Sequence, residues 1–277
     1  MTKGYLLFAI DTDTVDYSRL AYACALSIKI SQSAGSNAVA LVTNSDKQFN
    51  IPVFDQVIKY TGPEGMDARS RAFDYTPFDQ TILLDSDMLV LRNVSHYWNI
   101  FNDLFITTCP QTFRSKRFRY GYYRKLFEQY NLIDVYNAFT YFEKSETSRE
   151  FFDLVKIITD HPKEYINSFL PECKQHKLYT DEAFALALKI LDLEDTAVNL
   201  TWDFPRITHM KPNVQGWYGY FESWSADRLR FSLDEQAKVK IGVWQQSDIL
   251  HYVDKDLIID EIVETMEQQY ERLLHKI

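Results

Sequence analysis

The chain has 277 residues, of which 46% are hydrophobic and 25% are charged, so it is long enough for one large or two small domains with a substantial core. Its formal net charge of -9 excludes a general attraction to nucleic acid, and binding of a polyanion would require a local basic patch. Three widely spaced cysteines, Cys24, Cys109 and Cys173, predict reduced thiols and a cytoplasmic location. The apolar run at residues 5–10 is too short for a signal peptide or a membrane span.

The first part of the chain predicts a strand, a helix and a second strand. Residues 5–10 have the continuous apolar pattern of a buried strand, residues 17–30 have an amphipathic helical pattern, and residues 38–44 form another apolar run. This spacing is typical of a βαβ unit, which implies a largely parallel sheet. We therefore expect an α/β fold.

Carboxylates follow two of the predicted strands. Asp11 and Asp13 come after the first, and Asp85 and Asp87 interrupt the apolar run at residues 81–91. On an extended chain Asp85 and Asp87 point the same way, at the carboxyl end of a strand, where open α/β sheets bind their ligands. Such a pair would suit Mg²⁺ or Mn²⁺ shared with substrate phosphates. The alternative is a turn in which both side chains cap backbone N–H groups.

A basic and aromatic segment covers residues 113–125. Six cations are interleaved with five aromatic residues in this segment. The cations are Arg114, Lys116, Arg117, Arg119, Arg124 and Lys125. On an acidic chain this is the segment suited to a nucleic-acid backbone, with rings available to stack on bases. The alternative is a solvated loop that covers a nucleotide diphosphate.

The second half of the chain continues the alternation of strands and helices. A short helix is also expected around Arg69 and Arg71. The further predicted elements are helices at 96–101, from about 148 and at 183–191, and strands at 104–108, 135–142, 198–200, 206–209 and 239–244. Thr180 is expected to cap the helix at 183–191, and acids at Asp181 and Glu182 are ordinary in a first helical turn.

The last helix has an apolar stripe, which favours a core or dimer contact over a membrane surface. The stripe consists of Ile259, Ile262, Val263, Met266, Tyr270, Leu273, Leu274 and Ile277. No internal repeat and no linker is evident. We therefore expect one domain at residues 1–255, with an amphipathic helix at 256–277 packed on it.

One candidate function is phosphate-ester hydrolysis. Residues 10–15 resemble the opening motif of the haloacid dehalogenase superfamily. That resemblance implies Asp11 as nucleophile and Asp13 as acid/base, with Thr43 ending the second strand and the later acidic pair holding Mg²⁺. It gives no task to His251.

A second set of motifs runs through nearly the whole chain. These motifs are residues 8–11, Arg71 ahead of residues 76–81, Asp85-Ser86-Asp87, residues 137–139, Asp181-Glu182 and His251-Tyr252 with Lys255 following. Together they resemble the GT-A glycosyltransferases, in particular the retaining galactosyl- and glucosyltransferases. The resemblance implies a GT-A type fold, a mostly parallel central sheet flanked by helices, and transfer of a sugar from a UDP-sugar donor.

The same resemblance implies site residues. Contacts to the donor nucleotide would come from Ala9, Asp11, Tyr17, Asn44, Arg71, Asp85, Ser86, Asn137 and Lys255. Mn²⁺ or Mg²⁺ would be held by Asp85, Asp87 and His251, and Asp181 and Glu182 would lie near the sugar as catalytic groups. The spacing between His251 and Lys255 is shorter than in the family and lacks its glycine, so His209 and Lys211 form a competing pair.

Within that class, four motifs resemble transferases of T-even-type phages. They are residues 122–125, 208–212, 215–217 and 251–255. The resemblance implies 5-hydroxymethylcytosine in double-stranded phage DNA as acceptor, including transfer of arabinose, and a place in the host cytoplasm. The DNA contacts would be Arg114, Lys116, Arg117, Arg119, Tyr122 and Arg124. A saccharide or protein acceptor is the alternative. The order of the motifs favours a transferase over a phosphohydrolase, and the acidic total argues against a DNA-binding protein without activity.

Overall fold

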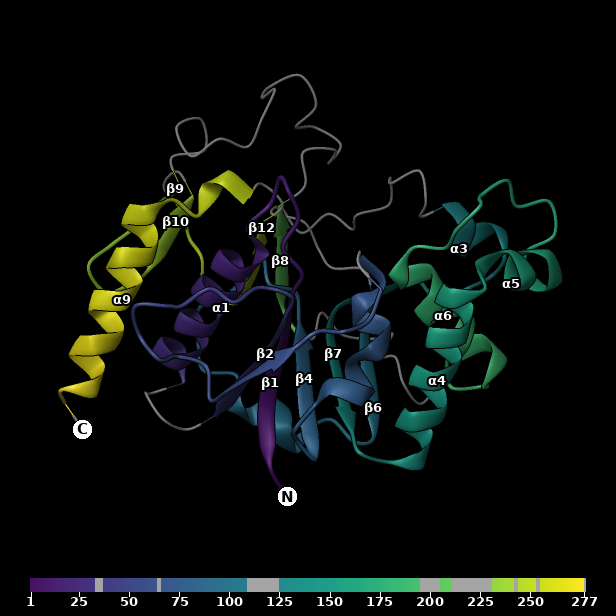
Figure 1. The fold of residues 1–277 in the computed structure, drawn as a ribbon, viewed down its shortest axis with the longest axis horizontal. Helices are drawn as coiled ribbons and strands as arrows, with labels where there is room; N and C mark the ends of the chain where they lie inside the picture. Colours follow the sequence, from purple (N-terminus) through teal and green to yellow (C-terminus); the bar gives the residue numbers. More distant parts are fainter. Residues whose placement is uncertain are drawn as a thin grey trace.

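The predicted α/β class is confirmed. The computed structural model describes residues 1–32, 37–63, 66–108, 125–194, 205–210, 231–241, 244–252 and 255–276. It has a six-stranded, mostly parallel central sheet with helices on both faces and a helix at the C-terminal end (Figure 1).

The central sheet has the strand order β3-β2-β1-β4-β7-β6. Its strands are β1 (Lys3–Ala9), β2 (Ala38–Thr43), β3 (Gln56–Lys59), β4 (Gln80–Leu84), β6 (Leu104–Thr108) and β7 (Val135–Glu143). The first four of these strands in the chain run parallel, whereas β7 is antiparallel to both β4 and β6. Strand β3 is short and mostly exposed, and because it has no buried apolar run, its sequence pattern does not predict a strand.

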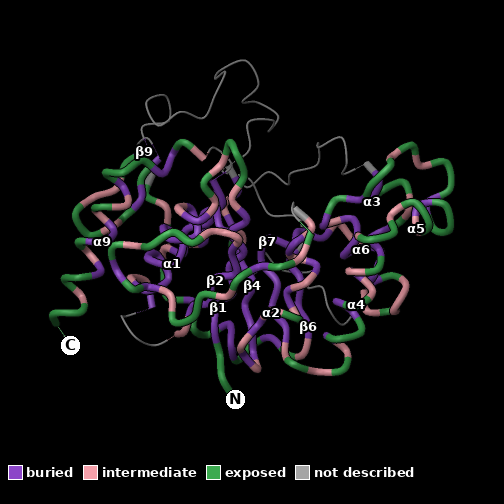
Figure 2. The backbone as a smooth tube through the Cα atoms, in the orientation of Figure 1, coloured by how far each residue is buried: buried purple, intermediate pink, exposed green. Residues whose placement is uncertain are grey.

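Alternate side chains of β1 enter two separate cores, one on each face of the sheet. Tyr5, Leu7 and Ala9 pack into one cluster, whereas Leu6, Phe8 and Ile10 pack into the other. Strands β1, β4 and β7 are accordingly buried along almost their whole length (Figure 2).

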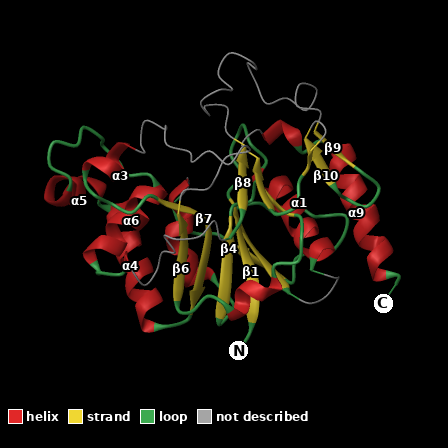
Figure 3. Cartoon of the chain, turned by 180° about the vertical axis from the view of Figure 1, so that it is seen from behind, coloured by secondary structure: helices red, strands yellow, loops and turns green. Residues whose placement is uncertain are grey.

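The helices divide between these two cores (Figures 1 and 3). Helices α1 (Tyr17–Ser31) and α9 (Asp260–Leu274) belong to the first. The second contains α2 (Ala72–Tyr75), α3 (Lys125–Gln129), α4 (Glu146–Asp160), α5 (Pro162–Phe169) and α6 (Thr180–Ile190). Short 3₁₀ helices are η1 (Met66–Arg71), η2 (Ser95–Asn99) and η4 (Lys255–Leu257). In the part of the chain that the structure describes, no helix combines the length and apolar character needed to cross a membrane.

Two smaller sheets complete the architecture. One has the order β5-β12-β8 and consists of β5 (Met88–Val90), β12 (Ile249–Tyr252) and β8 (Ile207–Met210). The other is antiparallel and consists of β9 (Phe231–Leu233), β10 (Val239–Ile241) and β11 (Trp244–Gln245). The chain leaves the central sheet after β4, turns at Ser86 and Asp87, and enters the first small sheet as β5. The expectation of an extended chain through Asp85 and Asp87 is therefore wrong.

Most predicted elements differ from the observed ones by only a few residues at their ends. The helix expected from about residue 148 begins at Glu146, and the Ser145 hydroxyl accepts a hydrogen bond from the Ser148 N–H at 3.1 Å. Thr180 is not the cap of α6 but its first residue, and the Glu182 carboxylate accepts a hydrogen bond from the Tyr179 N–H at 2.8 Å. Residues 198–200, expected as a strand, lie outside the described residues.

The C-terminal helix is attached to the first core by apolar and polar contacts. Ile262, Met266 and Tyr270 are buried in that core. Glu267, only 9% exposed, accepts hydrogen bonds from the Tyr22 hydroxyl at 2.7 Å and from Asn50 Nδ2 at 3.1 Å. We propose that residues 256–277 fold together with residues 1–255 as one unit, because this carboxylate requires both partners to offset its burial.

The Tyr22→Phe variant tests this attachment. Removing the hydroxyl leaves the buried Glu267 carboxylate with fewer donors and the Ile51 N–H, 3.1 Å from that hydroxyl, without its acceptor. We expect the free energy of unfolding to fall by about 1–3 kcal/mol, measured by urea titration. Tyr165→Phe is a matched control, since Tyr165 stacks on Phe169 and is not fully buried. Equal stability of the two variants would contradict the proposed role of Glu267.

Candidate metal centre

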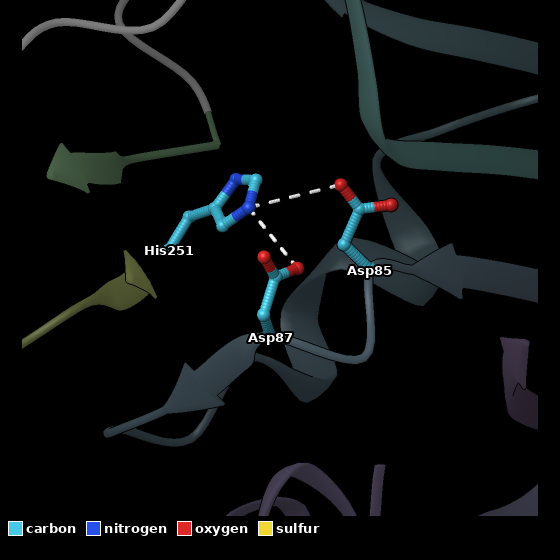
Figure 4. A group of neighbouring side chains, drawn as sticks. All are labelled: Asp85, Asp87 and His251. Atoms are coloured by element: carbon cyan, nitrogen blue, oxygen red, sulfur yellow. Dashed lines mark ion pairs between the residues drawn. The ribbon is translucent and has the colours of Figure 1, made fainter. Parts of the chain in front are cut away.

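Two carboxylates and one imidazole converge where the central sheet meets the first small sheet (Figure 4). His251 Nε2 lies 3.1 Å from Asp87 Oδ1 and 3.8 Å from Asp85 Oδ2. One ligand atom from each of the three residues lies within 4.8 Å of the others. Asp87 and His251 are both only 7% exposed.

The backbone fixes this arrangement from both sheets. The Asp85 N–H donates to the Ala138 carbonyl at 3.1 Å, which extends the β4–β7 pairing by one residue. The Tyr252 N–H donates to the Asp87 carbonyl at 3.1 Å, and His251 pairs with Met88 across β12 and β5. Two ladders therefore hold the turn from both sides, and the side chains converge because of the turn rather than because of strand alternation.

The three residues fit a divalent cation. Two carboxylates with one imidazole are a donor set suited to Mn²⁺ or Mg²⁺. The other ring nitrogen of His251, Nδ1, contacts the Tyr136 hydroxyl, so Nε2 is the nitrogen that faces the carboxylates. Metal-binding histidines are commonly oriented by such a second contact.

His209 lies next to His251 but occupies a different position. The two residues pair across β8 and β12, and their rings stack with centroids 4.5 Å apart and planes 7° apart. The Tyr136 ring packs on His209 at 5.0 Å. Among the described residues, the group with metal-ligand spacing contains His251 and not His209. Lys211, the second member of the competing pair, lies outside the described residues.

Two cations balance the charge of the acidic pair. Arg69 pairs with Asp85, and Lys255 pairs with Asp87. Burial favours a raised pKa for Asp87, but the charges and hydrogen bonds of His251 and Lys255 outweigh it and hold the pKa of this carboxyl well below its usual range. Burial also lowers the pKa of Arg69, and the charges of Asp181 and Asp87 oppose that shift.

A cavity of about 260 Å³ opens beside the acidic pair. Phe8, Ile10 and Tyr17 contribute apolar walls, and the Lys255 ammonium lies 5.8 Å from the centroid of the Tyr17 ring. Arg69 and Lys255 line the same cavity, together with Asp85, Ser86 and Asp87. A ring-lined pocket with cations and carboxylates can hold a planar base and a diphosphate.

Asp11 and Asn44 lie together at the start of α1. The Asn44 side chain accepts a hydrogen bond from the Asp11 N–H at 2.8 Å and donates to the Asp11 carbonyl at 3.0 Å. The Asp11 carboxylate accepts from the Ser18 N–H at 2.7 Å and lies 3.4 Å from Lys47 Nζ. These contacts shape the connection between β1 and α1. Ala9 is the fully buried end of β1.

The structure brings Arg69, rather than Arg71, to the acidic pair. In a 3₁₀ helix with three residues per turn, residues two apart point in different directions. Arg71 binds both carboxylate oxygens of Asp160 on α4, at 2.8 and 2.9 Å. Sequence reasoning missed Arg69 as a site residue, and the only available signal was that two arginines precede the acidic strand.

Asn137, Asp181 and Glu182 meet where β7 approaches α6. The Asn137 N–H donates to Asp181 Oδ1 at 2.9 Å, and the Asn137 side chain is only 3% exposed. Asn137 Nδ2 is buried and has no hydrogen-bond acceptor among the described residues. Glu182 is fully buried and accepts hydrogen bonds from the Tyr179 N–H at 2.8 Å and Gln175 Nε2 at 3.2 Å, so its contacts stabilise the start of α6.

The expected DNA contacts, from Arg114 to Arg124, lie outside the described residues.

The fold is shared with solved structures, although no family model and no curated protein matches the sequence. The glycosyltransferase GlyE of Streptococcus pneumoniae TIGR4 aligns over 100% of this chain with a TM-score of 0.53 and 12% identity. Its apo form aligns with a TM-score of 0.53 and 13% identity. The chain has the fold of a glycosyltransferase. It spans 63% of the length of either GlyE structure, and at this identity the likeness shows the fold alone.

Metal binding tests the cluster directly. We expect His251→Ala to weaken Mn²⁺ binding at least about 100-fold by calorimetric titration, because even the loss of an outer contact typically costs about 10- to 100-fold. His161→Ala is the control, since the side chain of His161 is 58% exposed and lies on another part of the chain. His209→Phe keeps a ring against His251 and should bind nearly as the wild type does. A loss in His209→Phe equal to that in His251→Ala would instead make His209 the ligand.

The contact between Tyr136 and His251 gives a separate prediction. Tyr136→Phe removes the hydroxyl that faces Nδ1, and we expect a loss in Mn²⁺ affinity of about 10- to 100-fold. Tyr141→Phe is a control on the same strand, since its hydroxyl donates to Glu143 at 2.6 Å and its removal should affect stability without affecting the metal. Wild-type Mn²⁺ affinity in Tyr136→Phe would show that this hydroxyl does not orient the imidazole.

Proposed function

We propose that the protein is a metal-dependent glycosyltransferase that moves a sugar from a UDP-sugar to an acceptor hydroxyl. The observation that carries the proposal is the convergence of Asp85, Asp87 and His251 beside a cavity with both ring and cationic walls. The shared fold adds support, because GlyE is a glycosyltransferase.

The residues of the cluster would act on the leaving group. Asp85, Asp87 and His251 would hold a divalent cation, whose positive charge would offset the charge developing on the departing nucleotide diphosphate. Arg69 forms an ion pair with Asp85, and Lys255 forms one with Asp87. Both cations would bind the phosphates through charge-assisted hydrogen bonds. In this proposal Arg69 takes the diphosphate-binding role that the family resemblance implied for Arg71.

The remaining side chains would orient the donor. Tyr17 and its apolar neighbours in the cavity wall would contact the base, while Asp11, hydrogen-bonded to Asn44, would contact the base or ribose. The Asn137 backbone N–H donates to the Asp181 carboxylate, and these two residues would bind the sugar and steady positive charge at its reacting carbon. Glu182 would act by holding the start of α6 in place.

The geometry favours a transferase over the phosphohydrolase alternative. The Asp11 carboxylate already accepts a hydrogen bond from the Ser18 N–H and lies beside Lys47, so it is not poised as a nucleophile. Among the described residues, the group with metal-ligand spacing includes His251 and neither Asp11 nor Asp13.

For the acceptor we propose 5-hydroxymethylcytosine in phage DNA, with arabinose as one candidate sugar and the host cytoplasm as the place of action. This proposal is supported by the sequence motifs at 122–125, 208–212, 215–217 and 251–255 and by the basic, aromatic segment at 113–125. A saccharide or a protein is the competing acceptor.

Mass spectrometry of hydroxymethylcytosine duplex DNA, incubated with the protein, Mn²⁺ and a panel of UDP-sugars, tests the reaction. We expect a mass increase of one sugar per modified base, with at least about a 100-fold lower rate in Asp87→Asn, because removing one electrostatic contact in an active site costs about 10²–10³. Asp13→Asn should retain activity, since Asp13 is exposed and outside the cluster. Phosphate release from a phosphoester that depends on Asp13, without sugar transfer, would favour the phosphohydrolase.

DNA binding tests the acceptor separately. We expect hydroxymethylated duplex to bind in a salt-dependent manner, and binding to weaken strongly in Arg117→Ala/Arg119→Ala, measured by fluorescence anisotropy. Lys3→Ala/Lys144→Ala removes the same charge at the end of the central sheet where β1 starts and β7 ends. This control variant should bind the DNA as the wild type does. Equal affinity in both double variants would refute the DNA contact.

A further inference from the structure

A second and larger cavity lies away from the metal cluster. It has a volume of about 600 Å³ and lies between α1, the end of β5, the β9–β10 hairpin and α9. Its floor includes Val90, Val239 and Met266, which are almost completely buried. Its volume lies in the range of about 300–1,000 Å³ that is typical of small-molecule sites.

The walls of this cavity are basic, although the protein carries a net charge of -9. The lining contains four cations, Arg92, Lys238, Arg272 and Lys276, and one carboxylate, Glu235. They come from three separate parts of the chain, the segment after β5, the β9–β10 hairpin and α9. Cations that gather on one cavity favour an anionic ligand, since their mutual repulsion is relieved when it binds.

Among the described residues, contacts of these side chains neutralise only part of this charge. Arg92 Nε lies 3.0 Å from Asp248 Oδ1. Arg272 donates to the Glu235 backbone carbonyl at 3.2 Å, and because a carbonyl carries no net charge, this contact does not neutralise the guanidinium. The nearby Asp234 carboxylate accepts from the backbone N–H groups of Gln236 and Lys238, both at 2.9 Å, and so closes the hairpin.

The two cavities are separate. They share no lining residue. Helix α1 connects them, because Tyr17 at its start lines the first cavity and Ser27 and Ser31 line the second. Ten helical residues from Tyr17 to Ser27 correspond to about 15 Å at 1.5 Å per residue. Ser27 also links α1 to β5, since its hydroxyl accepts a hydrogen bond from the Val90 N–H at 2.9 Å.

We propose that this cavity is a second ligand site, for a small organic anion with an apolar ring and a phosphate or similar group. The apolar floor binds the ring, and the cations bind the anion. An extended polyanion such as DNA is bound through its phosphates and has no need of such a floor. The proposal does not depend on the glycosyltransferase activity.

Calorimetric titration of the full chain in metal-free buffer tests the site with three probes. Phenyl phosphate carries both features, whereas inorganic phosphate and benzyl alcohol carry one each. We expect phenyl phosphate to bind with one-to-one stoichiometry and more tightly than either control, and its affinity to fall as salt is added. Lys238→Gln/Lys276→Gln, at two exposed positions, should weaken binding at least about tenfold, because hydrogen bonds to charged groups each contribute about that much or more.

Further variants distinguish this cavity from its surroundings. Lys240→Gln removes an exposed charge on the same hairpin that does not line the cavity, and should bind as the wild type does. Arg272→Gln should weaken binding as the lysine variant does. Lys255→Gln should leave the affinity of the second cavity for phenyl phosphate unchanged, because Lys255 lines the first cavity.

Four results would overturn the proposal. The first is that phenyl phosphate does not bind, and the second is that its binding is lost in Lys255→Gln and not in the lysine double variant. The third is that inorganic phosphate binds as tightly as phenyl phosphate, and the fourth is that duplex DNA binds through Lys238 and Lys276 while phenyl phosphate does not.

Discussion

The central constraint in this molecule is the charge of two carboxylates in a turn that is largely buried. Asp85 and Asp87 lie between strands of different sheets, and Asp87 is only 7% exposed. Carboxylates removed from water are costly unless cations accompany them. The fold supplies the cations Arg69, from before β4, and Lys255, from near the C-terminal end, and it places the His251 imidazole beside Asp87. Segments far apart in the sequence are therefore held together by the same charges that make the turn a candidate metal site.

The topology explains how these segments meet. The chain leaves the central sheet at the acidic turn and continues as β5, which pairs with β12, the strand that carries His251. Strand β8 pairs with the other edge of β12 and stacks His209 against His251. Helix α9 follows β12 after η4 and packs on the core beside α1, where Glu267 binds Tyr22 and Asn50. The attachment of the C-terminal helix and the position of His251 thus depend on the same stretch of chain.

The sequence was informative where local pattern determines structure. The apolar runs of β1, β2 and β6 and the helical pattern of α1 predicted those elements closely. For β1 and β2 the reason is that burial on both faces of parallel strands leaves a continuous apolar signal. The exposed edge strand β3 gave no such signal, since its position depends on pairing with β2 alone. The extended chain expected at Asp85 was wrong because an apolar run on both sides of a turn looks like one strand. Nothing in a local pattern shows that its two halves belong to different sheets.

Site residues were harder to predict for the same reason. Arg69 and Arg71 are two residues apart, and only the direction of η1 distinguishes the one that meets Asp85 from the one that binds Asp160. His209 and His251 are neighbours on two paired strands, so the choice between them as metal ligand depends on which imidazole faces the carboxylates. The order of acidic and basic motifs along the chain indicated the class of chemistry. Only three-dimensional contacts assign the individual roles.

The most direct test of this account is anomalous diffraction at the manganese edge from crystals grown with Mn²⁺ and UDP. We expect one strong anomalous peak bounded by Asp85, Asp87 and His251 Nε2, with diphosphate density extending from it towards Arg69 and Lys255. A manganese peak elsewhere, or UDP bound with its phosphates remote from these residues, would contradict it.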